Sequence, residues 1–221
     1  SSAASDVYKR QLEKLQDLMP AYDSYGVKRG GDDNEKKSEM NAVFWLKDKY
    51  DCVEQNTFWL SSTPEQESKF DGAGCYRICS YVVLQNKETG KQYIHMNTHL
   101  DNASEEAADY GAQVICTYLA DLQAKYPQTA VVLTGDFNEY KDGEACQTVA
   151  QVLNNTADVA ADAAMPQITY QQWGELEEKD GGAPIDYIFT SSTNVARTAV
   201  LNDLSNGYVS DHYGIFAELA I

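Results

Sequence analysis

The sequence predicts a single α/β domain in which strands outnumber helices, and three observations support this. Several segments rich in Val, Ile, Tyr and Phe have the length and composition of β-strands. Other segments repeat apolar residues at helical spacing. No internal repeat, low-complexity tract or linker divides the 221 residues, a length that suits one domain of mixed strands and helices.

The strands are expected on both sides of a long helical stretch. A polar, Gly-rich loop at 26–37 precedes them, and a loop at 61–74 separates two of them. The predicted strands are Asn41–Lys47, Asp51–Leu60, Arg77–Asn86, Gln92–His99, Ala130–Thr134, Ile168–Tyr170, Ile185–Thr190, Ala196–Asn202 and Gly214–Ala220.

Three helices are expected between these strands. The first spans Leu12–Met19, where apolar residues recur at helical spacing until Pro20 ends the pattern. The second begins after Ser104, a helix-capping residue type that two acidic residues follow. The third covers Gly143–Leu153.

The composition excludes some classes of protein. A hydrophobic content of 43% is too high for a disordered chain. A net charge of −17 disfavours binding to nucleic acid through a basic surface, although bound divalent cations would supply positive charge locally. The five cysteines have no zinc-site spacing, and we expect neither zinc nor disulfides. No apolar run is long enough to cross a membrane, and a cytoplasmic or secreted location stays open.

The first eleven residues are expected to be foreign to the domain. The string Asp6–Gln11 resembles the translation of an adapter used in sequencing libraries. On this interpretation residues 1–11 are a non-native segment and residues 12–221 form the domain. The alternative is an ordinary start of the first helix.

A first motif with catalytic potential is Thr134–Asn138, where an apolar strand stops at a glycine. Asp136 and Asn138 follow, two residues apart. Carboxylate and amide oxygens at the rim of a sheet suit Mg²⁺ or Mn²⁺ and can also hold a water molecule. Taken alone, the same residues are typical of an ordinary turn.

Two imidazoles lie in further motifs. His99 ends a predicted strand within Asn97–Asp101, where it could donate to a phosphate oxygen. Asp186 lies in an apolar strand, and a buried carboxylate needs a partner, for which a histidine is the natural candidate. The segment Ser210–Tyr213 offers both a carboxylate and an imidazole just before the last strand.

The four motifs in this order resemble the endonuclease/exonuclease/phosphatase superfamily. They read Asn-Thr-His-Leu-Asp, Thr-Gly-Asp-Phe-Asn, Ile-Asp-Tyr-Ile-Phe and Ser-Asp-His, and the resemblance extends from about Leu12 onward. The segment Thr57–Pro64 is similar to a largely uncharacterised bacterial branch. The resemblance implies a four-layer α/β/β/α sandwich of two mixed, mainly antiparallel sheets, here lacking the first strand of the family.

The resemblance also implies roles for individual residues. Asp136 would orient or deprotonate the attacking water, and Asn138 would position water or metal together with it. Asp211 would be a metal ligand. The residues expected around the phosphate are His212 with its partner Asp186, His99 with its partner Glu39, and Arg77 as a further contact.

The function implied is hydrolysis of a phosphoester bond by in-line attack of water, with Mg²⁺ or Mn²⁺ as cofactor. The enzyme would be a phosphodiesterase, a nuclease or a phosphatase, acting on nucleic acid, a phospholipid head group or a small phosphate ester. We expect a monomer without a stable protein partner. The alternative is a catalytically inactive relative that acts as a binding module.

One departure from the family pattern bears on activity. The family has a Gln-Glu pair before its first helix, and the Glu is its main metal ligand. Ser5 and Asp6 stand at this position. Because Asp6 belongs to the segment interpreted as non-native, it is not taken as a shortened ligand. We expect the native protein to have the strand and the Glu, and the 221-residue chain without them to be an impaired enzyme.

Overall fold

A six-stranded sheet forms the centre of the molecule. A computed structural model describes residues 2–31, 38–165, 168–177, 180–205 and 207–220. The strand order of this sheet is β4-β5-β6-β7-β10-β8. Its strands are β4 (Tyr50–Trp59), β5 (Ile78–Asn86), β6 (Gln92–His99), β7 (Ala130–Asp136), β10 (Asp186–Thr190) and β8 (Asn154–Asn155).

Strands β6 and β7 run parallel, whereas the other neighbours in this sheet are antiparallel. A parallel pair needs a crossover, and helix α2 (Glu105–Lys125) supplies it. Ser104 caps this helix by accepting a hydrogen bond from the backbone N–H of Ala107. The crossover brings the ends of β6 and β7 to the same edge of the sheet.

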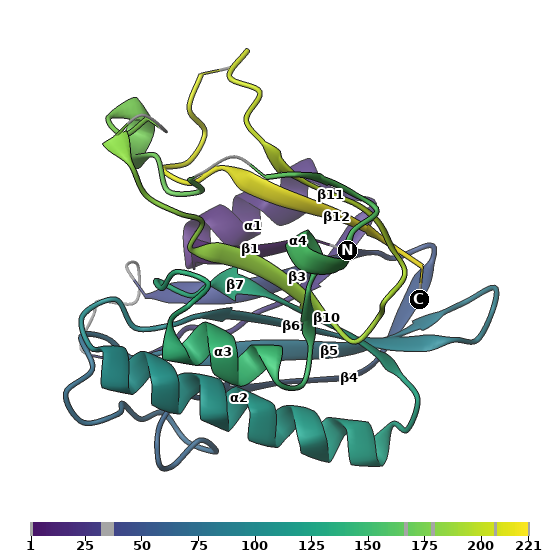
Figure 1. Ribbon diagram of the computed structural model, residues 1–221. Coiled ribbons are helices and arrows are strands. Elements are labelled where there is room, and N and C mark those ends of the chain that lie inside the picture. The colour runs from purple at the N-terminus through teal and green to yellow at the C-terminus, as the bar shows by residue number, and fades with distance from the viewer. Residues whose placement is uncertain (1, 32–37, 166–167, 178–179, 206, 221) are drawn as a thin grey trace.

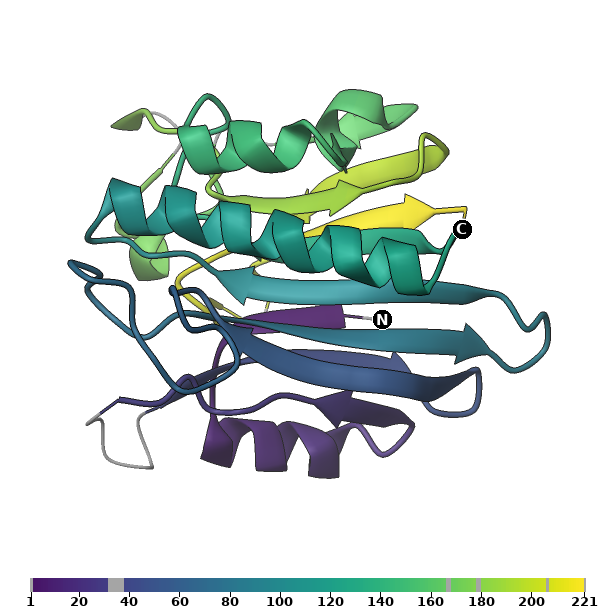
Figure 2. The same ribbon diagram turned by 90° about the horizontal axis from the view of Figure 1, so that it is seen from below.

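Helices α2 and α3 (Glu144–Ala150) cover one face of the central sheet, as Figures 1 and 2 show. Buried residues of both helices pack against side chains from β5, β6, β7 and β10. Ile115, Leu119, Met96 and Leu133 are among the largest fully buried side chains here. This contact is the main hydrophobic core.

Two three-stranded sheets face the other side of the central sheet. One has the order β1-β3-β2, and the other β12-β11-β9. Their strands are β1 (Ser2–Tyr8), β2 (Tyr22–Tyr25), β3 (Glu39–Leu46), β9 (Asp162–Ala164), β11 (Val195–Leu201) and β12 (Gly214–Leu219). Short helices α4 (Thr156–Val159) and η1 (Gln172–Gly174) lie in the connections.

Strand β3 shows why helix α1 (Lys9–Leu18) is the fourth layer. Alternate side chains of a strand point to opposite faces. Val43 and Trp45 pack toward the central sheet, while Ala42 and Phe44 pack with apolar residues of α1. The layers of the described chain are therefore, in order, helices α2 and α3, the central sheet, the two facing sheets and helix α1, as Figure 1 shows.

The predicted α/β class and layered arrangement are confirmed, with differences in detail. The facing layer is two three-stranded sheets rather than one sheet. The predicted strand Ile168–Tyr170 makes only an isolated bridge between Tyr170 and His212. The third helix ends at Ala150, because the chain turns after it. The sequence did not predict β1, β2, β8 or β9.

Some expectations stay open. Part of the predicted loop at 26–37 lies outside the described residues, namely 32–37. Residues 2–8 form β1 and pair with β3, and the foreign origin of residues 1–11 stays a prediction. Within the described residues, no helix has the length and apolar character needed to cross a membrane.

Gly135 lets β6 and β7 approach closely beside the site. A Cβ atom there would lie 2.4 Å from the carbonyl oxygen of Thr98. Gly135→Ala is therefore expected to destabilise the fold by about 1–3 kcal/mol through overpacking. Thermal unfolding should show a midpoint lower by roughly 3–10 °C. Gly214→Ala, which meets only Leu201 at 3.7 Å, is the control. Equal midpoints for the two variants would contradict this interpretation.

Candidate active site

Three adjacent strands bring His99, Asp136 and Asp186 to one edge of the central sheet. His99 is opposite Asp136 in the parallel β6–β7 ladder. Asp186 is opposite Asp136 in the antiparallel β7–β10 ladder. Because neighbouring strands lie about 4.8 Å apart, the register alone places these side chains within reach of one another.

Asp136 is the centre of this group. Its Oδ2 atom lies 3.4 Å from Nε2 of His99 and 3.8 Å from Nε2 of His212. Its Oδ1 atom accepts a hydrogen bond of 2.8 Å from the backbone N–H of Asn138. Two imidazoles therefore face one oxygen of a buried carboxylate.

His212 reaches the group from the loop before β12. Its Nδ1 atom and Oδ2 of Asp186 are 2.8 Å apart, as the sequence predicts for this pair. The backbone around it is fixed by a 2.7 Å hydrogen bond from the N–H of Tyr213 to the carbonyl of Thr169. The Asp186 partner leaves Nε2 of His212 directed toward Asp136.

Asn138 connects the two strand ends. Its φ of 52° is left-handed, a conformation that Asn adopts more readily than most residues. Its side-chain amide donates to the carbonyl of Leu100 at 3.0 Å. The N–H of Leu100 in turn donates to the carbonyl of Asp136 at 2.9 Å. The ends of the strands that carry His99 and Asp136 are thus linked through Asn138.

The local charges shift two pKa values. Burial opposes a charge on His212, but the hydrogen bond to Asp186 and the negative charges of Asp186, Asp136 and Asp211 outweigh it and raise its pKa to about 9. Burial and the charge of Asp186 raise the pKa of Asp136 to about 6, against the opposing effect of the two histidines. At neutral pH the site therefore holds an imidazolium beside a carboxylate.

Glu39 lies on the far side of His99, as expected. Its Oε2 atom is 4.0 Å from Nδ1 of His99. The same oxygen also pairs with Arg29, a residue that the sequence did not single out. Glu39 is thus held by an arginine while it faces the histidine.

Two of the expected site residues make their polar contacts with residues outside this group. The Asp211 carboxylate is not part of it, and its Oδ1 atom accepts from the hydroxyl of Ser210 at 3.4 Å. Its role as a metal ligand stays a prediction. Arg77 is buried at the start of β5, where its Nε atom lies 3.4 Å from Oδ2 of Asp101.

The donors around Asp136 fit a divalent cation. Asp136, Asp186 and His212 each offer a ligand atom, and these atoms lie within 4.8 Å of one another. The carboxylates of Asp136 and Asp186 suit Mg²⁺ or Mn²⁺, whereas His212 could bind a cation only after losing the proton that it holds at neutral pH. The group therefore agrees with the expected cofactor.

The same three residues line one part of a cavity of about 780 Å³. It lies between the central sheet and β12, and Asn97, Thr134 and Ile215 are among the other residues along it. The three residues therefore border a cavity on this side of the central sheet.

Sequence reasoning missed the residues that hold together the segments carrying Asp186 and His212. The hydroxyl of Thr169 accepts from the N–H groups of Ile185 and Asp186 at 3.0 and 3.2 Å. The Tyr170 ring lies 4.9 Å from the His212 ring. The predicted strand at 168–170 was the one available signal, since a strand must pair with a neighbour.

Asp101 should make the stability of the protein depend on pH. Burial opposes its charge, but backbone N–H groups and the Arg77 guanidinium hold its pKa below the usual range. Because the pKa of Asp101 is lower in the folded state than in the unfolded state, its ionisation stabilises the fold at pH values above the ordinary pKa near 3.9. This stabilisation is lost as the pH falls through the folded-state pKa. Asp101→Asn should cost about 3–5 kcal/mol at pH 7, because it breaks a buried ion pair, and less near pH 3.

Urea unfolding at the two pH values measures this difference. Asp51→Asn removes an exposed pair with Lys87 and should change the unfolding free energy little at either pH. A cost for Asp101→Asn that does not depend on pH would contradict the assignment of the lowered pKa.

Comparison with known proteins agrees with this geometry. The model of the Endonuclease/Exonuclease/phosphatase family matches residues 16–212. The chain belongs to this family, whose members are phosphoester hydrolases. A search of curated proteins found no match to the chain.

Several solved structures are similar to the chain. A mannosyl-6-phosphatase from Bacteroides thetaiotaomicron is 28% identical with a TM-score of 0.89, over 99% of this chain and 84% of that one. A family member from Bacteroides vulgatus is 28% identical with a TM-score of 0.87, over 97% and 82%. The human Nocturnin catalytic domain, at 17% identity, a TM-score of 0.70 and coverage of 98% and 80%, shares the fold.

Proposed function

We propose that the protein is a divalent-metal-dependent hydrolase of phosphoester bonds, and that the group around Asp136 is its active site. The observation that carries the proposal is the convergence of two imidazoles on Oδ2 of Asp136, at 3.4 and 3.8 Å. An imidazolium and a second imidazole beside a carboxylate offer the hydrogen-bond donors and the base that in-line attack of water on a phosphoryl group requires.

In this proposal each residue of the group has a separate role. Asp136 holds the attacking water and takes its proton as the new P–O bond forms and the ester P–O bond breaks. His212, kept cationic by Asp186, donates from Nε2 to a phosphoryl oxygen whose negative charge grows in the transition state. His99 makes a second contact of the same kind, and Asn138 holds the Asp136 turn in place.

Mg²⁺ or Mn²⁺ held by Asp136 and its neighbours would supply positive charge to the phosphoryl oxygens. The raised pKa of Asp136 supports this assignment, because a carboxylate crowded by another anion gains from a bound cation. Metal binding should therefore weaken as pH falls below about 6, where a proton competes for Asp136.

We favour small phosphate esters as substrates over long nucleic acids. The net charge of −17 would repel a polyanion, and the chain has no excess of basic residues to offset this repulsion. The similar Bacteroides structure described as a mannosyl-6-phosphatase supports the same choice. A sugar phosphate or another small phosphomonoester is the substrate class we propose.

We also expect the 221-residue chain to hydrolyse slowly. Its sequence has Ser5 and Asp6 where the family pattern has Gln-Glu. This difference supports a site that lacks the carboxylate of that Glu.

A phosphoester panel tests the proposal. p-Nitrophenyl phosphate, bis-p-nitrophenyl phosphate, sugar phosphates and single-stranded DNA are incubated with the chain in Mg²⁺, in Mn²⁺ and in EDTA. We expect slow, metal-dependent hydrolysis that is fastest for phosphomonoesters. Faster cleavage of DNA would contradict the substrate class, and the absence of any hydrolysis would favour the binding module.

A further inference from the structure

Asp101 is a buried carboxylate two residues beyond His99, and the proposed chemistry does not use it. Its side chain has no exposed surface. It accepts hydrogen bonds from two loops, at 3.0–3.2 Å from the backbone N–H groups of Gly74, Cys75, Ala103 and Ser104. A carboxylate with this many fixed donors has one orientation and stays ionised.

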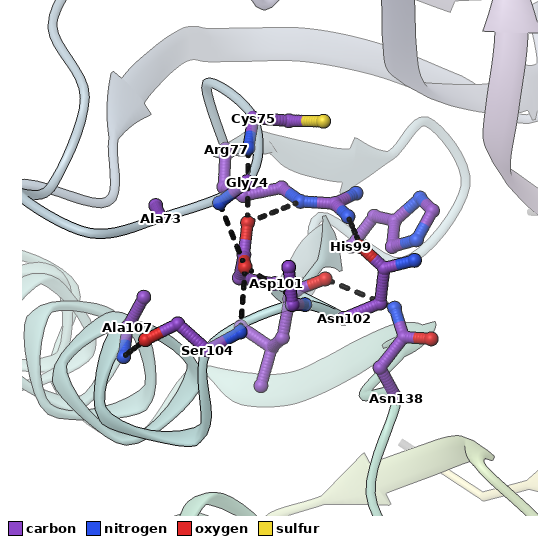
Figure 3. A network of polar contacts seen from close by, with 12 residues as sticks. Ala73, Gly74, Cys75, Arg77, His99, Asp101, Asn102, Ser104, Ala107 and Asn138 are labelled. Atoms are coloured by element: carbon purple, nitrogen blue, oxygen red, sulfur yellow. Dashed lines mark hydrogen bonds and ion pairs between the residues drawn. The ribbon is translucent and has the colours of Figure 1, made fainter.

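The fifth donor to Asp101 is Arg77. Its Nε atom lies 3.4 Å from Oδ2 of Asp101, and its Nη2 atom donates to Oδ1 of Asn102 at 3.0 Å. Figure 3 shows the guanidinium beside the imidazole of His99. The planar guanidinium is thus held along one edge by Asp101 and Asn102, and in Figure 3 it points toward the ring of His99.

The backbone between His99 and Asp101 is fixed as well. Leu100 donates to the carbonyl of Asp136 and accepts from the side chain of Asn138, at 2.9 and 3.0 Å. The backbone on the C-terminal side of His99 is therefore fixed, and so is the guanidinium that points toward its ring in Figure 3. Its partner Asp136 belongs to the same set of hydrogen bonds.

We propose that Asp101 and Arg77 are positioning residues that set the orientation of the His99 imidazole toward Asp136. The inference rests on the proposed function, because the orientation matters only if His99 contacts the phosphoryl group. A displacement of about 1 Å in such a group can slow a reaction on the order of 100-fold. A rigid supporting shell prevents this displacement.

Burial of Arg77 favours this role over the direct phosphate contact that the sequence suggests. The residue is only 6% exposed. Its Nη1 atom is shielded from solvent and has no hydrogen-bond partner among the described residues. The other two nitrogens bond to Asp101 and Asn102. A phosphate oxygen would have to displace neighbouring groups to reach the guanidinium.

Imidazole NMR tests the proposal without any need for turnover. The chain has three histidines, so ¹H–¹⁵N spectra of the rings are simple to assign with single variants. In Asp101→Asn and Arg77→Met, the His99 signals should shift or broaden while those of His95 keep their positions. Asn102→Ala, which removes only the acceptor of Nη2, should give a smaller change in the same direction and preserve the fold.

The matched control is the exposed pair formed by Arg197 and Asp162. It joins the same atoms, Nε and Oδ2, at 3.5 Å. Arg197→Met and Asp162→Asn should leave all three histidines unchanged. Unchanged His99 signals in all the Asp101, Arg77 and Asn102 variants, or equal changes at His95, would overturn the proposal.

Kinetics on the best phosphomonoester separates positioning from direct contact. Arg77→Met should lower kcat on the order of 10- to 100-fold and leave KM and inhibition by inorganic phosphate unchanged. In a His99→Ala background the same change should have almost no further effect. Inhibition by inorganic phosphate that is weakened tenfold or more in Arg77→Met would overturn the positioning role. A double variant in which the effects of Arg77→Met and His99→Ala on kcat multiply would also overturn it. Failure of the proposed function itself would appear as a wild type without hydrolysis, which the NMR result does not require.

Discussion

Asp136→Asn is expected to slow phosphoester hydrolysis on the order of 10³-fold or more. Asparagine keeps the shape of the side chain and its hydrogen bond from the N–H of Asn138. It removes the negative charge that would take the proton from water and hold a divalent cation. The loss should appear in kcat, measured at saturating Mg²⁺.

Asp158→Asn is the matched control for this prediction. Asp158 is exposed and pairs with Lys141, and its replacement should leave the rate unchanged. A rate for Asp136→Asn within tenfold of the wild type would contradict the role of Asp136. The rate of the wild type should also fall below about pH 6, where Asp136 without metal takes up a proton.

Asp186→Asn is expected to lower kcat on the order of 10²- to 10³-fold near pH 8. Burial alone would lower the pKa of His212, and the hydrogen bond and charge of Asp186 raise it to about 9. Without that charge, His212 is a neutral imidazole at pH 8 and regains its proton only at lower pH. The ratio of wild-type to variant kcat should therefore be smaller at pH 6 than at pH 8.

In the wild type, we expect the loss of the His212 proton to limit the rate at high pH. His212 stays cationic until pH rises through about 9, so its rate should fall only above that value. Asp162→Asn, which removes an exposed partner of Arg197, is the control for charge loss elsewhere. A loss in Asp186→Asn that is the same at pH 6 and pH 8 would contradict the assignment of Asp186 as the source of the His212 charge.

Much of this site could be predicted from sequence because its residues lie at strand ends. The strand ending at His99 and the strand running into Asp136 are clear in the apolar pattern. Once they are neighbours in a parallel pair, their ends must meet. A carboxylate at 186 in an apolar strand needed a partner, and the structure supplies His212.

The supporting contacts could not be predicted in the same way. Thr169 bonds to the backbone of Ile185 and Asp186, and Arg29 pairs with Glu39. These contacts depend on the paths of loops, which have no periodic pattern in the sequence. The family resemblance indicates Arg77 as a phosphate contact, but only the structure shows that its guanidinium is buried against Asp101.

The division of the facing layer also needed the structure. The pattern of β3 predicts a strand buried on both sides, but not which strands flank it. Strand β1 joins β3 at one edge, and β12 pairs with β11 in a separate sheet. Pairing between distant strands is set by the whole packing arrangement, which local propensity does not determine.

The most direct test of the central claim is phosphate release from p-nitrophenyl phosphate by the chain and by His212→Ala, each with Mg²⁺ and with EDTA. We predict hydrolysis in Mg²⁺ that EDTA removes, that added Mg²⁺ restores, and that His212→Ala abolishes while the folded spectrum is kept. No hydrolysis in Mg²⁺ or Mn²⁺, or an equal rate for His212→Ala, would contradict the account of this site as the active centre of a phosphoester hydrolase.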